Sequence, residues 1–415
     1  MFLRRLHLQD FKCHADLEIG FGTDKKENRK WTLILGENGT GKSNVLKAIA
    51  LITAGSNGLG ELLGDADQWI RVDQKECRIS ATLVTKEGEE RFISLTFKRG
   101  DNLSNIISFN QKSLELIDNA IEKSVRNYFV VGYGASRRLS NYPFAGERKN
   151  SSQRASNVRN LFDNNVALNP LTSWAIDLDY RNAQSGLAIV EDTLNDFLPD
   201  TYFARIDRER KQLIFATADG DIPLDQLSDG YQNMAAWIGD LLFRITSNFK
   251  DYEKPLSARG LLLIDEIDLH LHPKWQRNLI DFIERKLPHF QVVASTHSPL
   301  TAQQAGEGEL YALRRTASKA VEIIPFIGSP KTLLINQLLM TPVFGLETDE
   351  SVEVEKLKAE YRDLSDREQD LNAAEKKQFK AIKAKVAKDL PRRPSALISN
   401  AELDLLDQIK SKLKV

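Results

Sequence analysis

Three uninterrupted apolar runs break the otherwise mixed pattern of polar and apolar positions along the chain. They are residues 31–35, 260–264 and 291–295, with the sequences WTLIL, GLLLI and QVVAS. Runs of this length are typical of strands in a parallel sheet, which is buried on both faces. An amphipathic helix at residues 42–53 follows the first run after a glycine-rich turn, and another at residues 273–286 would cross between the other two. The pattern predicts an α/β fold.

Alternating apolar and polar positions, which indicate strands with one buried face, flank that first strand and helix on both sides. Residues 1–20 alternate as two strands around a polar break, and residues 77–98 alternate as a hairpin that turns at residues 86–89, KEGE. A short apolar strand follows at residues 128–132. We therefore expect a mixed sheet arrangement around the glycine-rich turn.

Helical periodicity takes over in two later parts of the chain. Residues 141–154 are polar and turn-rich, residues 157–197 have helical spacing, and strands return near residues 202–216, so a helical lobe is expected as an insertion. Residues 351–390 are strongly charged with apolar residues at helical spacing, which predicts one or two amphipathic helices. These either fold on the body as a hairpin or form an arm that binds a partner.

Composition narrows the class of protein without naming a partner. The 415 residues are 41% hydrophobic and 28% charged, as in soluble globular proteins, and the net charge of −1 excludes a basic field over the whole chain. Cys13 and Cys77 lack metal-ligand spacing and agree with a reducing cytosol, so both are expected as small apolar fillers. No apolar run reaches the roughly 18 residues of a membrane span. A cytoplasmic protein without membrane contact is expected.

The glycine-rich turn carries the first candidate chemistry. Residues 36–43, GENGTGKS, fit G-x-x-x-x-G-K-[ST] between a buried strand and a helix N-terminus, which is the context a phosphate-binding loop requires. Lys42 would reach the β- and γ-phosphates, and Ser43 would hold Mg²⁺. The predicted nucleotide-binding residues are Gly36, Asn38, Gly39, Gly41, Lys42, Ser43 and Asn44. We therefore expect ATP bound with Mg²⁺.

Two acids end the second apolar run. Asp265 and Glu266 follow it directly, as in a Walker B element. In that interpretation Asp265 helps to hold Mg²⁺, and Glu266 polarises the water that attacks the γ-phosphate. The pair alone is ambiguous, because a strand end is also a natural place for solvated acids.

Two further motifs are candidates for the same nucleotide-binding site. Residues 227–232, LSDGYQ, precede a helical stretch, where Ser228 and Gly230 would grip a γ-phosphate unless Ser228 is an ordinary N-cap. His297 follows the third apolar run, and ligands gather at the carboxyl ends of strands in α/β sheets.

In this order, the motifs of residues 1–330 resemble the SMC/RecF/OLD branch of ABC-type ATPases. LSDGYQ is similar to the ABC signature LSGGQ, from which it departs at Asp229 and Tyr231. The resemblance implies an ABC-ATPase head with a mixed sheet around the P-loop, an inserted helical lobe and a helical C-terminal tail. It also implies a head-to-tail homodimer that sandwiches two ATP molecules, with His297 as the switch histidine at the γ-phosphate. Assembly beyond the dimer stays open.

The resemblance assigns a role to each part of the chain. Residues 1–140 would form the first lobe with Walker A, 141–255 the insertion with the signature, 256–330 the Walker B and switch-histidine part, and 331–415 a charged helical region. No Q-loop glutamine is evident, and the turn at residues 132–137 occupies a plausible position for that loop. Arg137 and Arg138 would either bind phosphate there or solvate the loop.

The whole chain looks most like the ATPases of Septu-type and retron-linked antiphage systems, which work with a separate effector, often an HNH nuclease. The resemblance implies a slow, regulated ATPase that dimerises on ATP and controls such an effector in prokaryotic antiviral defence. The alternative is a RecF-like DNA-repair ATPase that clamps DNA directly. Nucleic acid would then meet a locally basic segment that contains Arg137, Arg138, Arg148, Lys149 and Arg154, with Glu147 as its acid. A transporter subunit is disfavoured, and a nucleotide-dependent scaffold stays open.

Overall fold

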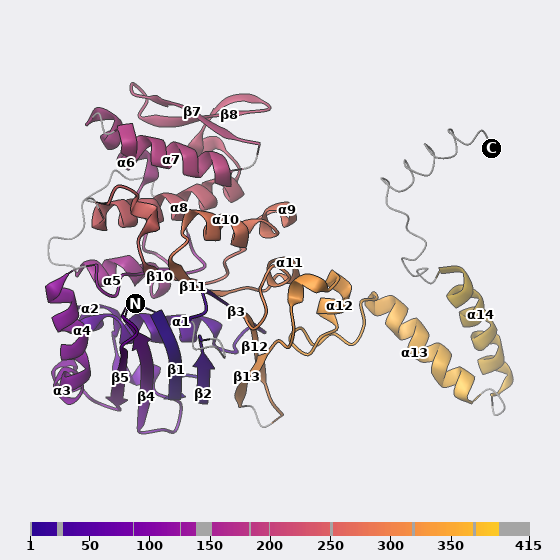
Figure 1. The fold of residues 1–415 in the computed structure, drawn as a ribbon. Coiled ribbons are helices and arrows are strands. Elements are labelled where there is room, and N and C mark those ends of the chain that lie inside the picture. Colours follow the sequence, from indigo (N-terminus) through magenta and orange to yellow (C-terminus); the bar gives the residue numbers. More distant parts are fainter. Residues whose placement is uncertain are drawn as a thin grey trace. The chain divides into compact units, whose positions relative to one another are not determined.

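The computed structural model describes residues 2–22, 28–85, 87–124, 126–137, 152–181, 184–198, 200–249, 252–317, 320–367 and 371–389. Contacts divide the chain into two compact units, residues 1–345 and 346–415. The larger unit contains the sheets and all of the predicted motifs (Figure 1). The smaller unit contains helices.

A six-stranded sheet at the centre of the larger unit contains all three apolar runs. Its order is β13-β12-β3-β11-β10-β6, in which β13 runs antiparallel to β12 and the other neighbours are parallel. The strands are β3 (Trp31–Gly36), β6 (Val130–Tyr133), β10 (Gly260–Ile264), β11 (Phe290–Ser295), β12 (Leu310–Arg315) and β13 (Val321–Pro325). Every residue of β10 and β11 is buried. The predicted α/β fold is therefore confirmed.

Two apolar cores lie on opposite faces of this sheet. Leu261 of β10 belongs to one core and Leu262 to the other, because successive side chains of a strand point to opposite faces. On the first face, α1 (Lys42–Ile52) shares its core with an antiparallel sheet of order β2-β1-β4-β5. Its strands are β1 (Phe2–Phe11), β2 (His14–Gly20), β4 (Glu76–Val84) and β5 (Glu90–Lys98). The alternating segments are thus strands, as expected.

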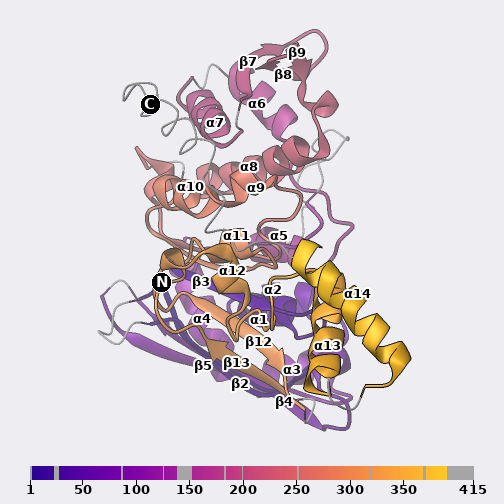
Figure 2. The same cartoon turned by 90° about the vertical axis from the view of Figure 1, so that its right-hand side faces the viewer.

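The second face carries the predicted helical lobe (Figures 1 and 2). The lobe contains α6 (Leu171–Tyr180), α7 (Gln184–Phe197), α8 (Asp229–Asn248) and a sheet of order β7-β8-β9, with β7 (Tyr202–Asp207), β8 (Gln212–Thr217) and β9 (Gly220–Pro223). Trp237 of α8 and Leu194 of α7 pack in the same core as Leu262. This continuous core fixes α8 relative to β10.

Eight further α-helices lie in the described part of the larger unit. They are α2 (Gly55–Leu62), α3 (Leu103–Phe109), α4 (Gln111–Lys123), α5 (Gln153–Val158), α9 (Pro273–Gln276), α10 (Leu279–Lys286), α11 (Pro299–Ala302) and α12 (Ile335–Leu339). The single helix expected at residues 273–286 is divided into α9 and α10. The Asn278 N–H donates to the Trp275 carbonyl in a tighter turn between them.

Two helices, α13 (Val352–Asp366) and α14 (Ala373–Asp389), form the described part of the smaller unit. They share an apolar cluster in which the rings of Tyr361 and Phe379 stack 5.4 Å apart. The charged segment is therefore a pair of helices. In the described parts of both units, no helix is long and apolar enough to cross a membrane.

Candidate functional site

The P-loop connects β3 to α1, and its glycines are required by shape. Gly36, Gly39 and Gly41 all have positive φ, of 152°, 81° and 89°. A Cβ on Gly36 would lie 2.6 Å from the Leu313 carbonyl oxygen, and one on Gly41 would lie 2.4 Å from His14 Nε2. Larger residues would therefore both strain the loop and collide with its neighbours.

Lys42 folds back over this loop. Its Nζ donates to the carbonyl oxygens of Gly36 and Glu37, at 2.7 and 3.1 Å. Burial lowers the pKa of Lys42, while Asp265 and Glu266 act against that shift. Helix α1 has no side-chain cap at Gly41 and no acid in its first turn, so its N-terminal N–H groups suit an anion.

A cavity of 440 Å³ opens at this loop. Eight of the predicted residues line it, namely Asn38, Gly39, Gly41, Lys42, Ser43, Asn44, Glu266 and His297. Lys12 and Cys13 of the β1–β2 turn also line it, together with Gln68, Ile70 and Val72. A larger hollow of 1090 Å³ near Arg126 and Arg259 holds none of the predicted residues. The smaller cavity is therefore the candidate site, on its chemistry rather than its size.

The Walker B acids follow β10, and Glu266 lines this cavity whereas Asp265 does not. Asp265 is buried, and its Oδ1 accepts a hydrogen bond from Ser295 Oγ at 2.5 Å. The same Oγ accepts the Glu266 N–H at 2.7 Å. Ser295 therefore ties both acids to the end of β11, two residues before His297.

The acids and the P-loop hydroxyl fit a magnesium ion. Mg²⁺ usually takes one or two carboxylates together with substrate phosphates and water. Asp265 supplies a carboxylate next to the cavity-lining Glu266, and Ser43 supplies a hydroxyl from the cavity wall. Oxygen donors of this kind and number are what the ion requires beside a bound nucleotide.

Arg137 lies under the Walker B turn, a position that sequence reasoning did not assign to it. Its side chain is buried, and Nη2 donates to the Glu266 carbonyl oxygen at 2.5 Å. Burial lowers its pKa to about 10, against the opposing effect of Asp265, Asp268 and Glu266. Arg137 therefore does not solvate a loop. The available signal was its place just after β6, at the same sheet edge as the acids.

The signature residues lie elsewhere in the chain. Ser228 precedes α8 and is exposed, and its side chain makes no capping hydrogen bond. A Cβ on Gly230 would lie 3.1 Å from the His270 carbonyl oxygen, and the ring of Tyr231 packs edge-on against Trp275 at 4.9 Å. The signature thus contacts the segment after Walker B. Neither Ser228 nor Gly230 lines the cavity of its own chain.

Two arginines of the basic segment, Arg137 and Arg154, lie among the described residues, and both donate hydrogen bonds to backbone carbonyls. Arg154 is largely buried, and its Nη1 donates to the Tyr128 carbonyl oxygen at 2.7 Å. Burial lowers its pKa to about 10. Arg137 is buried as well, whereas Arg138, Glu147, Arg148 and Lys149 lie outside the described residues. Both described arginines of the segment therefore hold backbone carbonyl groups of the protein itself.

Comparison with known proteins found a matching family model and several similar proteins. A family model described as "AAA domain, putative AbiEii toxin, Type IV TA system" matches residues 59–302. Septu protein PtuA of Bacillus mycoides is 26% identical over 354 residues, which are 83% of this chain and 45% of that protein. A retron Vc95 probable ATPase of Vibrio cholerae is 24% identical over 368 residues, 72% of this chain and 70% of that protein. The chain thus spans less than half the length of the first relative.

A solved Smc head domain from Pyrococcus furiosus also aligns with the chain. The TM-score is 0.49 at 14% identity, and the alignment covers 79% of this chain and 96% of that one.

Proposed function

The chain belongs to the family described as "AAA domain, putative AbiEii toxin, Type IV TA system", and from that premise we propose that it binds ATP with Mg²⁺ and hydrolyses it to ADP and phosphate. One observation carries the proposal. The P-loop residues Lys42 and Ser43 line one cavity together with Glu266 and His297, although these residues come from three distant parts of the sequence.

Each side chain has a part in that reaction. Lys42 exchanges its two carbonyl contacts for phosphate oxygens, and the N–H groups at the start of α1 bind the same phosphates. Glu266 accepts a proton from the attacking water, and His297 contacts the γ-phosphate. Bound Mg²⁺, held by Ser43 and Asp265, would neutralise charge that develops on the phosphates.

We further propose that the active form is a head-to-tail homodimer. The exposed Ser228 hydroxyl is not used as a helix cap, and the signature lies outside the cavity of its own chain. Both observations suit a signature that contacts the γ-phosphate of ATP held by the partner. In this arrangement neither subunit has a complete site alone.

The biological role follows from the relatives. The names Septu protein PtuA and retron probable ATPase support a role in antiviral defence, in which ATP-driven opening and closing regulates a separate effector such as an HNH nuclease. Direct clamping of DNA has less support among the described residues, because Arg137 is buried and Arg154 donates to the Tyr128 carbonyl oxygen.

The first experiment replaces Glu266 with Gln. Turnover is expected to fall at least about 100-fold, because the general base is lost, while ATP-dependent dimerisation in light scattering increases. Glu122→Gln, at an exposed position of α4, is the matched control and should behave as wild type. If wild type and Glu266→Gln form the same oligomer with and without ATP and neither hydrolyses it, a constitutive scaffold is the better description.

Complementation tests the dimer itself. Lys42→Ala destroys the Walker A side of a site, and Ser228→Arg destroys the signature side, so each variant alone should be inactive. Mixing them should restore up to about a quarter of wild-type activity, because half of the random dimers are mixed and each mixed dimer has one intact site. Any dependence of that site on nucleotide at the other site would lower this value. A mixture that is no more active than either variant alone contradicts the head-to-tail arrangement.

A further inference from the structure

The backbone of Glu266 is held in an unusual conformation. Its φ is 47°, in the left-handed region that a residue with a side chain rarely adopts. Two contacts hold the residue in place. Its N–H donates to Ser295 Oγ at 2.7 Å, and its carbonyl oxygen accepts from Arg137 Nη2 at 2.5 Å. The direction of the Glu266 carboxylate therefore depends on a clamp at each end of the residue.

Arg137 acts on this carbonyl from inside the protein. It does not line the ATP cavity, and none of the described carboxylates hydrogen-bonds to it. Its guanidinium lies over the ring of Trp237, with Cζ 5.9 Å from the ring centroid. Trp237 belongs to α8, the helix that begins at the signature. Arg137 is thus placed between the catalytic acid and the signature helix.

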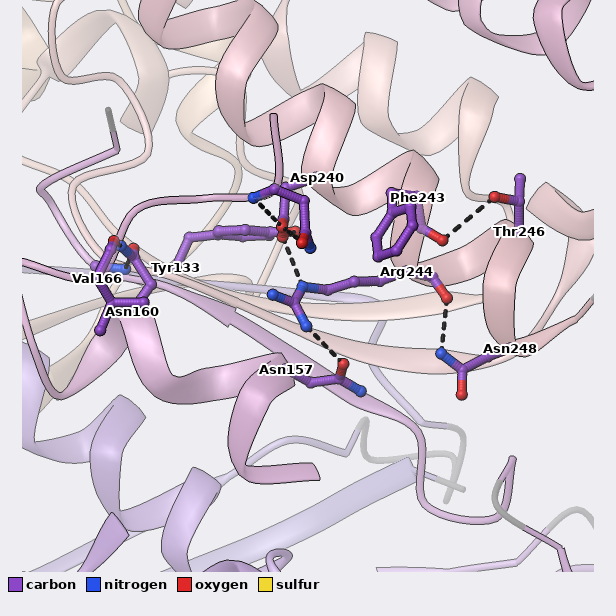
Figure 3. Close-up of polar contacts among 11 residues, drawn as sticks. Tyr133, Asn157, Asn160, Val166, Asp240, Phe243, Arg244, Thr246 and Asn248 are labelled. Atoms are coloured by element: carbon purple, nitrogen blue, oxygen red, sulfur yellow. Dashed lines mark hydrogen bonds and ion pairs between the residues drawn. The ribbon is translucent and has the colours of Figure 1, made fainter. Parts of the chain in front are cut away.

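A buried polar network fixes α8 to the strand that precedes Arg137 (Figure 3). Tyr133 Oη donates to Asp240 Oδ2 at 2.7 Å, and Arg244 Nε donates to the same oxygen at 2.6 Å. The other oxygen of Asp240 accepts from the backbone and side-chain N–H groups of Asn169, at 2.9 and 2.6 Å. With both oxygens occupied and no exposure to solvent, Asp240 locks the helix to β6.

Backbone hydrogen bonds connect this network to Asp265 and to the turn that precedes Arg137. The Asp265 N–H donates to the Tyr133 carbonyl oxygen at 2.8 Å. Asn160 shapes the turn between Tyr133 and Arg137, because its Oδ1 accepts the Gly134 N–H at 2.8 Å and its Nδ2 donates to the Ser136 carbonyl oxygen at 2.9 Å. A shift of α8 relative to β6 would therefore displace the Arg137 guanidinium.

We propose that Arg137 is a positioning residue that holds Glu266 through its carbonyl oxygen, and that the Tyr133–Asp240 contact makes this hold depend on the position of α8. The inference rests on the proposed ATPase function and deepens it. When Ser228 at the start of α8 engages the ATP of the partner, the same helix sets the Glu266 of its own chain. Hydrolysis at one site thereby responds to nucleotide at the other.

The main test separates catalysis from binding. Arg137→Met is expected to lower kcat about 100-fold and change KM less than about threefold, because a misplaced base loses rate and not affinity. Arg137→Lys, which can still donate to the carbonyl, should lose only about tenfold. Arg154→Met is the matched control, since Arg154 is also a largely buried arginine that donates to backbone carbonyls. It should lower stability without changing kcat of the folded protein.

Binding of the fluorescent nucleotide MANT-ATP in a Glu266→Gln background tests the route of action. If Arg137 acts through Glu266, the double variant Glu266→Gln with Arg137→Met binds MANT-ATP as tightly as Glu266→Gln alone. A tenfold loss of affinity in the double variant would show that Arg137 contacts phosphate, which overturns the proposal.

Tyr133→Phe keeps the test decisive if Arg137→Met fails to fold. This change removes one hydroxyl and leaves the ring against Trp237, so the fold should persist. The expected result is a three- to tenfold lower kcat and a Hill coefficient for ATP closer to one, with KM unchanged. Unchanged kcat and Hill coefficient in Tyr133→Phe overturn the link to α8.

Wild-type protein measured in parallel distinguishes the two levels of failure. Wild type that hydrolyses ATP alongside fully active Arg137 and Tyr133 variants overturns this inference and leaves the proposed function standing. Wild type that binds MANT-ATP without hydrolysing it overturns the proposed function and the inference with it.

Discussion

The P-loop and the Walker B turn border the same cavity, but they are held in different ways. The P-loop has contacts of its own, such as those from Lys42 Nζ to the carbonyls of Gly36 and Glu37, in addition to long-range contacts from His14 and Arg315. The Walker B turn depends on residues distant in sequence. Ser295 holds it from β11, and Arg137 holds it from the turn after β6.

The difference shows when a short sequence motif predicts the geometry of the loop that it forms. A loop held by neighbours within a few residues needs those neighbours in the motif, so the motif predicts the geometry. A turn held by long-range contacts needs only its acids in the motif, and the supporting residues appear elsewhere without a pattern. The two regions should therefore respond differently to substitution.

The largest expected effect is that of a methyl group inside the P-loop. Gly41→Ala places a Cβ at 2.4 Å from Cys13 Sγ and His14 Nε2, at a φ of 89°. We expect a loss of about 2–4 kcal/mol in the free energy of unfolding, from overpacking and left-handed strain together, and loss of ATP binding. Urea denaturation followed by circular dichroism measures the first, and MANT-ATP titration the second.

Gly39→Ala is the matched control for that change. Gly39 also has positive φ, 81°, but a Cβ there meets nothing within 4 Å. Only the backbone strain of about 1 kcal/mol should remain. Equal losses in the two variants would mean that the contact of the loop with Cys13 and His14 is unimportant.

The next effect concerns the Walker B turn and should change rate without affinity. Ser295→Ala removes the hydroxyl that donates to Asp265 and accepts from Glu266. We expect kcat to fall about 10- to 100-fold with KM little changed, because both acids lose their alignment. Ser94→Ala removes a hydroxyl that pairs with Ser80 across β4 and β5, and serves as the control in steady-state kinetics. A raised KM at constant kcat in Ser295→Ala would instead assign the hydroxyl to nucleotide binding.

The sequence predicted the strands and the contiguous motif because both depend on short-range patterns. The three apolar runs are central strands, and the loop residues Asn38, Gly39 and 41–44 line one cavity. Glu266 and His297 were also identified, because each directly follows a buried strand and the ends of parallel strands meet at one edge. That rule locates side chains without knowledge of the tertiary structure.

The sequence could not predict the residues that act through distant partners. Arg137 and Arg154 counted equally as basic residues of a polar segment, and only folding shows that each donates to a buried carbonyl. Asp240 similarly reads as one polar position in an amphipathic helix, although Tyr133, Arg244 and Asn169 all converge on it. The break between α9 and α10 was not predicted from the sequence for a related reason, since Arg277 and Asn278 carry no strong helix-ending signal.

The smallest effect tests whether the P-loop is as self-contained as its motif suggests, because His14 of β2 supports it from outside. His14 is buried with Nε2 at 3.3 Å from the Gly41 carbonyl oxygen, and burial lowers its pKa from 6.5 to about 4. The unfolded chain therefore binds a proton below pH 6.5 that the folded protein does not bind until about pH 4. Stability from this group is full above pH 6.5 and is lost as pH falls toward 4.

Between pH 7 and pH 5 this loss should be about 2 kcal/mol in the free energy of unfolding. Urea denaturation at both pH values should show a drop that is smaller by that amount in His14→Gln, whereas His289→Gln, at an exposed position, should match wild type. Asp268 and Glu309 have pKa values raised by burial and act in the opposite direction, so the difference between variant and wild type is the informative quantity. An unchanged drop in His14→Gln would mean that His14 is protonated in the folded protein, and that the P-loop tolerates a charge beside Gly41.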